Sequence, residues 1–103
     1  MSALDNGLRV AATATHATSA VATITGVAGK KTFITDISGS SDKAGGLILV
    51  KDGTTVIWQD RVSSTAGYSH TFATPITGSV GADVSVTVDG TAIANSNVSG
   101  VQL

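Results

Sequence analysis

Few residues of this chain have the type and spacing that catalysis or metal binding requires. The sequence holds two histidines, His16 and His70, and no cysteine. A zinc site in a protein gathers His, Cys or carboxylate ligands at short spacings, and neither histidine has such neighbours. No serine lies in a G-x-S-x-G nucleophile elbow, and no Ser/His/Asp set stands out. The sequence therefore predicts a protein that is not an enzyme and that uses no metal and no cofactor.

The aspartates and one glycine-rich segment have structural explanations. Most aspartates fall at turns and at the ends of apolar runs, where Asp is expected because its side chain bonds nearby backbone groups. The segment from Gly26 to Lys31 has the glycines and lysines of a phosphate-binding loop. It lacks the G-x-x-x-x-G-K-[ST] spacing and a following helix, both of which that loop needs. We expect a β-turn there.

The aromatic residues are the second group with a possible binding role. Tyr68, His70 and Phe72 alternate along one predicted strand, so they share one face. In one interpretation Trp58, Tyr68 and His70 form a platform on which sugar rings stack. In the other, the stripe is a half-buried face at the rim of a sheet, and Trp58 belongs to the core. The exposure of the Trp58 indole discriminates between them.

These residues must be positioned by β-strands. Short runs rich in β-branched residues are separated by Gly- and Ser-rich breaks, and no helical segment is apparent. The predicted strands are 20–25, 32–38, 46–51, 54–60, 68–73, 83–88, 91–94 and 98–103. Close spacing of this kind predicts an all-β, antiparallel β-sandwich of about eight strands.

Two Asp-Gly pairs predict two-residue hairpin turns, because both central residues of such a turn need a positive φ angle. A turn at Asp89-Gly90 pairs Val88 with Thr91 and Val86 with Ile93. In this register Ile93 lies with the valines on the core face. The other pair, Asp52-Gly53, pairs Lys51 with Thr54 in the same way.

The hairpin around Asp52-Gly53 is apolar on both faces. One face carries Leu47, Leu49, Val56 and Trp58, and the other carries Ile48, Val50 and Ile57. A two-layer sandwich buries only one of these faces in its own core. The second face is covered either by the chain itself or by another subunit, because large apolar patches are rarely left exposed. The second interpretation predicts a homo-oligomer with Ile48, Val50 and Ile57 at its interface.

Composition restricts the remaining classes of partner. The 103 residues carry a net charge of −1, and 13% of them are charged, against roughly 25% in an average domain. Such a chain has no long-range field to attract nucleic acid or an anionic membrane. Residues 20–103 form one β-sandwich domain, and residues 1–19, rich in Ala and Thr, are expected to form an arm. This arm is either a disordered tail or an extended segment on the domain or on a neighbouring subunit.

One resemblance to known proteins rests on three stretches of sequence. The first is residues 23–25 followed by residues 29–37, where Gly29-Lys30-Lys31 precedes an alternating run, and the others are residues 49–58 and 72–78. Together they resemble short virion proteins of tailed bacteriophages. The resemblance implies a jelly-roll-like β-sandwich in the virion, made in the host cytoplasm. It implies a capsid decoration or cement protein, a homotrimer bound to the major capsid protein or another virion protein. The alternative is a carbohydrate- or receptor-binding module of a tail or fibre.

Overall fold

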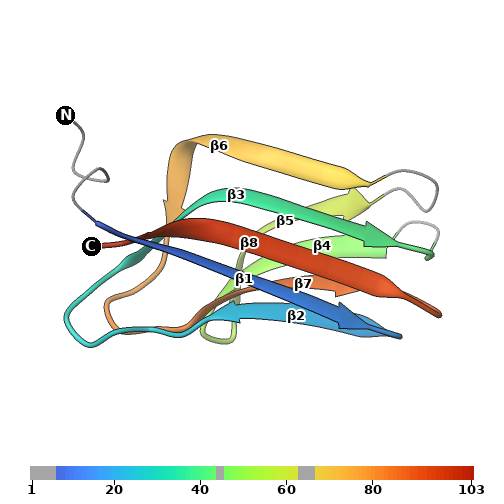
Figure 1. The fold of residues 1–103 in the computed structure, drawn as a ribbon, viewed down its shortest axis with the longest axis horizontal. Helices are drawn as coiled ribbons and strands as arrows, with labels where there is room; N and C mark the ends of the chain where they lie inside the picture. The colour runs from blue at the N-terminus through green and yellow to red at the C-terminus, as the bar shows by residue number, and fades with distance from the viewer. Residues whose placement is uncertain (1–6, 44–45, 63–66) are drawn as a thin grey trace.

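Eight antiparallel strands make up the fold in a computed structural model that describes residues 7–43, 46–62 and 67–103 (Figure 1). The strands are β1 (Leu8–His16), β2 (Ser19–Ile24), β3 (Thr32–Ser41), β4 (Gly46–Asp52), β5 (Thr55–Val62), β6 (Tyr68–Thr77), β7 (Val84–Asp89) and β8 (Ala94–Gln102). None of the described residues forms a helix, so that part of the chain holds no helix able to cross a membrane.

The strands form two four-stranded sheets with the orders β1-β8-β3-β6 and β2-β7-β4-β5. In Figure 1 the first sheet lies in front of the second. The chain passes from one sheet to the other at every connection except the β4–β5 hairpin. This order, with two sheets of four strands, is that of a jelly roll. The predicted all-β sandwich of about eight strands is therefore confirmed.

The core between the sheets narrows toward one edge. At the β1/β2 edge the two strands approach closely, and the small side chains of Ala12, Ala14, Ala20 and Ala22 line the interior there. At the opposite edge β5 and β6 make few contacts with each other, so larger side chains must fill the space between these two strands. The central core consists of fully buried branched residues of β3, β4 and β7: Ile34, Ile48, Val50, Val84, Val86 and Val88.

Of the alternatives for the N-terminal arm, the structure shows an extended segment on the domain for residues 8–16, and there the segment is an integral strand of the sandwich. Residues 8–16 form β1, which pairs with β8 at nine successive positions from Leu8↔Gln102 to His16↔Ala94. Alanine is a weak strand former, but the narrow β1/β2 edge accepts only small side chains. Residues 1–6 lie outside the described residues. The predicted number of eight strands is nevertheless correct. The prediction missed β1, but it divided β8 into two short strands at 91–94 and 98–103.

The hairpin at Asp52-Gly53 is confirmed, but its register is not. The loop is Gly53-Thr54, with Gly53 at φ 61° and Asp52 paired with Thr55. A bulge follows, so that Val50 pairs with Trp58 and Ile57 is the extra residue. A one-residue shift moves every later side chain to the other face of the sheet. Trp58 therefore shares the inner face with Ile48 and Val50 rather than the outer face with Leu47 and Leu49.

The predicted hairpin at Asp89-Gly90 is wrong. β7 pairs with β2 and β4, whereas β8 pairs with β1 and β3 in the other sheet. Positive φ angles in the described residues occur at Gly29, Gly53 and Gly81, and not at Gly90. The connection between β7 and β8 is held instead by Asp42, whose carboxylate accepts hydrogen bonds from the backbone N–H groups of residues 91–93. Ile93 is consequently 52% exposed rather than part of the core.

Candidate functional site

The structure brings together the three residues of the predicted platform, Trp58, Tyr68 and His70. The Trp58 ring centroid lies 6.2 Å from that of Tyr68 and 5.4 Å from that of His70. Phe72 completes the cluster, with an edge-to-face contact to Trp58 at 5.3 Å and a contact to His70 at 4.6 Å. β5 supplies the indole, and alternate residues of β6 supply the other rings, as their period-two spacing predicts.

This aromatic cluster fills the wide edge of the sandwich. Trp58, Tyr68 and Phe72 are half-buried and pack against the core. The rings face one another across the gap between β5 and β6, so they do not form a flat exposed row. Only His70 is exposed. The indole is therefore mainly a packing element, and the exposed area available for stacking a sugar is small.

A hydrogen bond between Tyr68 and Asp60 closes the outer side of the cluster. The Tyr68 hydroxyl donates to the Asp60 Oδ2 atom at 2.8 Å. Burial, together with this carboxylate, raises the pKa of Tyr68 to about 12. The same hydrogen bond, with one from the backbone N–H of Arg61, lowers the pKa of Asp60. Both effects favour the hydrogen-bonded pair at neutral pH.

The three residues of the predicted oligomer interface are separated by the fold. Ile48 and Val50 are 0% exposed and belong to the core between the sheets. They are not available to a second chain, which corrects the prediction for these two residues. Ile57, the bulge residue of β5, is 37% exposed next to Val56, which is 44% exposed.

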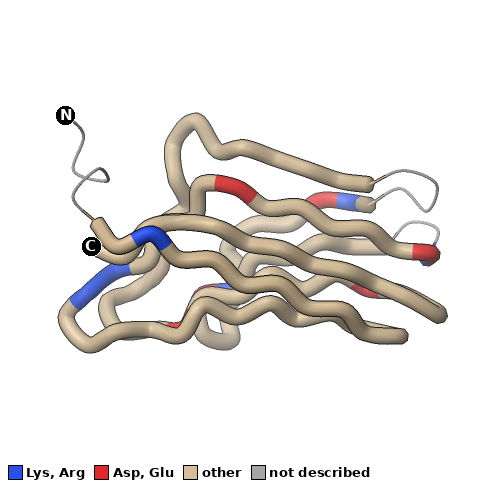
Figure 2. The backbone as a smooth tube through the Cα atoms, viewed as in Figure 1, with Lys and Arg blue, Asp and Glu red and all other residues tan. Residues whose placement is uncertain are grey.

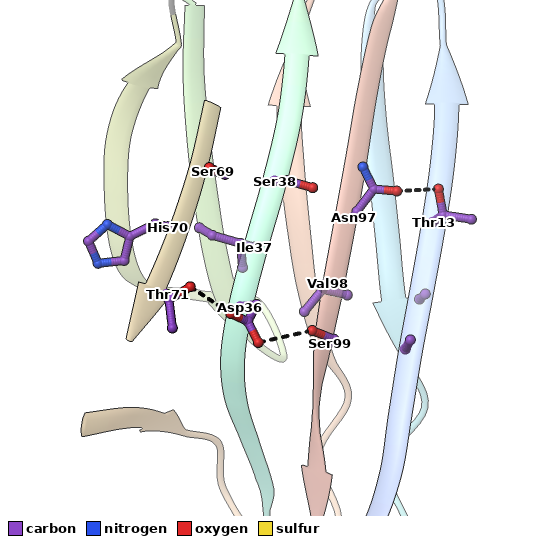
Figure 3. Close-up of a pocket in the computed structure, with 12 residues that line it drawn as sticks. Thr13, Asp36, Ile37, Ser38, Ser69, His70, Thr71, Asn97, Val98 and Ser99 are labelled. Atoms are coloured by element: carbon purple, nitrogen blue, oxygen red, sulfur yellow. Dashed lines mark hydrogen bonds between the residues drawn. The ribbon is translucent and has the colours of Figure 1, made fainter. Parts of the chain in front are cut away.

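A groove on the outer face of the β1-β8-β3-β6 sheet was not predicted, and both apolar and polar residues line it. It has a volume of ≈ 440 Å³ and crosses all four strands. Its polar lining is Thr13, Asp36, Ser38, Ser69, Thr71, Asn97 and Ser99 (Figure 3). These residues occupy alternate positions on their strands, a pattern visible in the sequence as T-x-T, S-x-S and N-x-N-x-S. Sequence alone does not show that the four strands are neighbours.

Asp36 is the acidic residue of this groove and joins three strands. Its carboxylate accepts hydrogen bonds from Thr71 of β6 at 2.7 Å, from Thr35 at 3.0 Å and from Ser99 of β8 at 3.5 Å. The bond from Thr71, followed by that from Thr35, lowers the pKa of Asp36. The β3 register shifts between Ile34 and Asp36, which places this carboxylate on the outer face. In Figure 3 the His70 ring extends on the far side of β6 from Asp36.

The remaining acidic groups of the described residues bind loops and form no metal site. In the described ranges no three His, Asp or Glu side chains gather where they could hold a metal ion. The Asp52 carboxylate accepts from the backbone N–H and hydroxyl of Ser79, and Asp83 accepts from the Gly26 N–H. The expected β-turn at the glycine-lysine segment is confirmed, since the Lys30 N–H donates to the Val27 carbonyl at 3.0 Å.

Comparison of the sequence with models of known protein families and with curated proteins finds no match.

Proposed function

We propose that this protein is a non-enzymatic structural protein of a tailed bacteriophage virion, a decoration protein that binds and stabilises the head surface. The observation that supports the proposal is the jelly-roll order of the two sheets, an architecture that recurs in viral capsid domains. The resemblance of residues 23–37, 49–58 and 72–78 to short virion proteins points the same way. In this function the protein binds the major capsid protein and turns over no substrate.

Multivalent attachment would provide the strength of binding. A homo-oligomer, with a trimer favoured by the resemblance, engages several neighbouring shell subunits at once. Each additional contact is then intramolecular, so weak contacts combine into a tight attachment. Ile57 and Val56, both partly exposed on the edge strand β5, are the most exposed apolar side chains of the doubly apolar hairpin and are therefore accessible to a second copy.

The oligomer is tested by sedimentation of wild type, Ile57→Lys and Ile93→Lys. Ile93 is the matched control, because it is an isoleucine that is 52% exposed in the β7–β8 connection. We expect Ile57→Lys alone to shift the protein toward monomer, since a charge at an apolar contact is costly. A wild-type protein that sediments as a monomer at micromolar concentration contradicts the oligomer.

The function is tested by mixing purified protein with undecorated heads and imaging the particles. We expect density at symmetry-related positions and particles that withstand a higher temperature before rupture. Bare shells after incubation with excess protein would reject the proposal. An unrelated protein of similar size and charge, mixed with heads in the same way, establishes the level of non-specific binding.

A carbohydrate-binding module is the second candidate, because jelly rolls also occur in lectins. The observation that favours it is the ≈ 440 Å³ groove, whose lining includes hydroxyl, amide and carboxylate groups beside apolar side chains, a combination that suits the hydroxyl groups and the apolar faces of a sugar. Two results together would select this function: the wild type is retained on host-cell polysaccharide, and it leaves heads bare. Ser38→Leu should lose the retention, because the larger side chain fills the groove. The aromatic cluster lies beside β6 and contributes only His70 to the lining of the groove.

A further inference from the structure

One end of the sandwich presents exposed aliphatic and basic side chains together. This end carries the start of β1, the end of β8, the β2–β3 connection and the β6–β7 connection (Figure 1). Its aliphatic members are Leu8, Val27 and Val80, which are 58%, 41% and 57% exposed. Its basic members, all exposed, are Arg9, Lys30 and Lys31. We call these six residues the turn patch.

Two β-turns of the same kind hold the centre of the patch. In one, the Lys30 N–H donates to the Val27 carbonyl at 3.0 Å and Gly29 has φ 79°. In the other, the Ala82 N–H donates to the Ser79 carbonyl at 3.1 Å and Gly81 has φ 75°. A positive φ at the third residue is the signature of a type II turn and favours glycine.

The two turns are joined to each other and to the sheets. The Gly81 N–H donates to the Lys30 carbonyl at 2.8 Å, and the Gly26 N–H donates to the Asp83 carboxylate at 2.7 Å. Lys31 exchanges two backbone hydrogen bonds of 3.0 Å with Leu103. The exposed valines are therefore held in place before any partner arrives, and docking requires little additional ordering of the backbone.

The cations of the patch are not neutralised within the described part of the chain. Arg9, Lys30 and Lys31 form no ion pair with another described residue. Among the described residues, the acids at this end are Asp52, which follows the half-buried Lys51, and Asp83, and each accepts hydrogen bonds from the loops. Figure 2 shows the longest blue segments at this end beside small red ones, and red segments at the opposite end, two of which adjoin blue. The opposite end carries Asp42, Asp60 and Asp89 beside Lys43 and Arg61.

We propose that the turn patch is the surface by which this protein docks on the particle, and that its partner is an acidic protein surface with a shallow apolar depression. The inference rests on the proposed function and names the end of the molecule that performs it. Exposed aliphatic side chains at the same end as exposed cations match a partner surface that combines apolar area with acidic side chains. The three cations are fewer than the four to eight typical of lipid-binding clusters. The patch also lacks the Trp or Phe that inserts into a bilayer.

The test measures binding of purified variants to undecorated heads by co-sedimentation. Lys31→Glu is compared with Lys43→Glu, the same charge change on an exposed lysine at the opposite end. Val80→Ser is compared with Ile93→Ser, because these residues are 57% and 52% exposed. We expect each patch variant to weaken apparent affinity about tenfold or more. The control variants should bind as the wild type does, and added salt should weaken wild-type binding.

Each result supports or rejects a defined statement. If the wild type binds heads and all four variants bind equally well, the turn patch is not the docking surface, and the proposed function stands. If the wild type leaves heads bare, the proposed function fails and this inference fails with it. Binding to phosphatidylserine vesicles, but not to heads, would assign the patch to a lipid surface and overturn the protein partner. Circular dichroism of every variant verifies that the sandwich is folded.

Discussion

Replacing Trp58 with alanine tests whether the aromatic cluster supports the fold. A tryptophan buries 150–250 Å² when enclosed, which at about 25 cal/mol per Å² corresponds to roughly 4–6 kcal/mol. Trp58 is half-buried, and alanine retains part of the burial. The edge-to-face contact with Phe72 and the contacts with Tyr68 and His70 are lost as well. We therefore expect Trp58→Ala to lower the free energy of unfolding by about 2–4 kcal/mol.

Urea unfolding followed by far-ultraviolet circular dichroism measures this loss. Fluorescence is unsuitable because Trp58 is the sole tryptophan of the chain. Protein concentration is held fixed, since association would shift the midpoint. Trp58→Phe should recover about half of the loss, and Ile93→Ala, at an exposed site, should change stability by less than about 0.5 kcal/mol. A Trp58→Ala variant within about 1 kcal/mol of wild type would refute the packing role and favour a ligand platform.

Three further perturbations follow from the backbone and the carboxylates. Gly53→Val should cost at least about 1–2 kcal/mol in chemical denaturation, because φ is 61° at this position and a β-branched residue is strained there; an unchanged midpoint would contradict the turn. The Asp42 pKa is lowered from 3.8 to about 2, chiefly by the hydrogen bond from the Thr91 N–H, so its stabilisation is present above the unfolded-state pKa and is lost as pH falls toward 2. Thermal melts between neutral pH and pH 2 should therefore show a smaller acid-induced decrease in Asp42→Asn than in wild type, and equal decreases would argue against this role. Deleting residues 2–18 removes all of β1, so the truncated protein should melt at a clearly lower temperature by circular dichroism, and an unchanged melting temperature would show that β1 is dispensable.

Local patterns in the sequence predict the strands well where side chains and turns carry the information. Alternation of β-branched and polar residues places β3, β4 and β7 within a few residues of their observed bounds. The valines of β7 are all fully buried, as their alternation predicts. Gly53 and Gly29 occupy turns with positive φ, because the conformational freedom of glycine is a property of the residue itself.

Pairing and register depend on partners that are distant in sequence. Asp89-Gly90 has the composition of a hairpin turn, but β8 lies in the other sheet, where it pairs on one side with β1 and on the other with β3. The bulge in β5 turns Trp58 to the inner face, and the pairing of β4 with β7 and β5 places Ile48 and Val50 in the core rather than at the predicted interface. β1 was missed because Ala and Thr are ordinary in an arm, and only the narrow edge beside β2 makes small side chains suitable for a strand.

By itself the sequence determined the all-β class, most of the strands and the alternating stripe of Tyr68, His70 and Phe72, because these follow from local periodicity and turn chemistry. Tertiary structure alone decided the order of the strands, the contact of Trp58 with this stripe, the groove around Asp36 and the turn patch. These features join residues tens of positions apart. Their positions are set by which arrangement buries the apolar faces and satisfies the backbone hydrogen bonds of all eight strands at once.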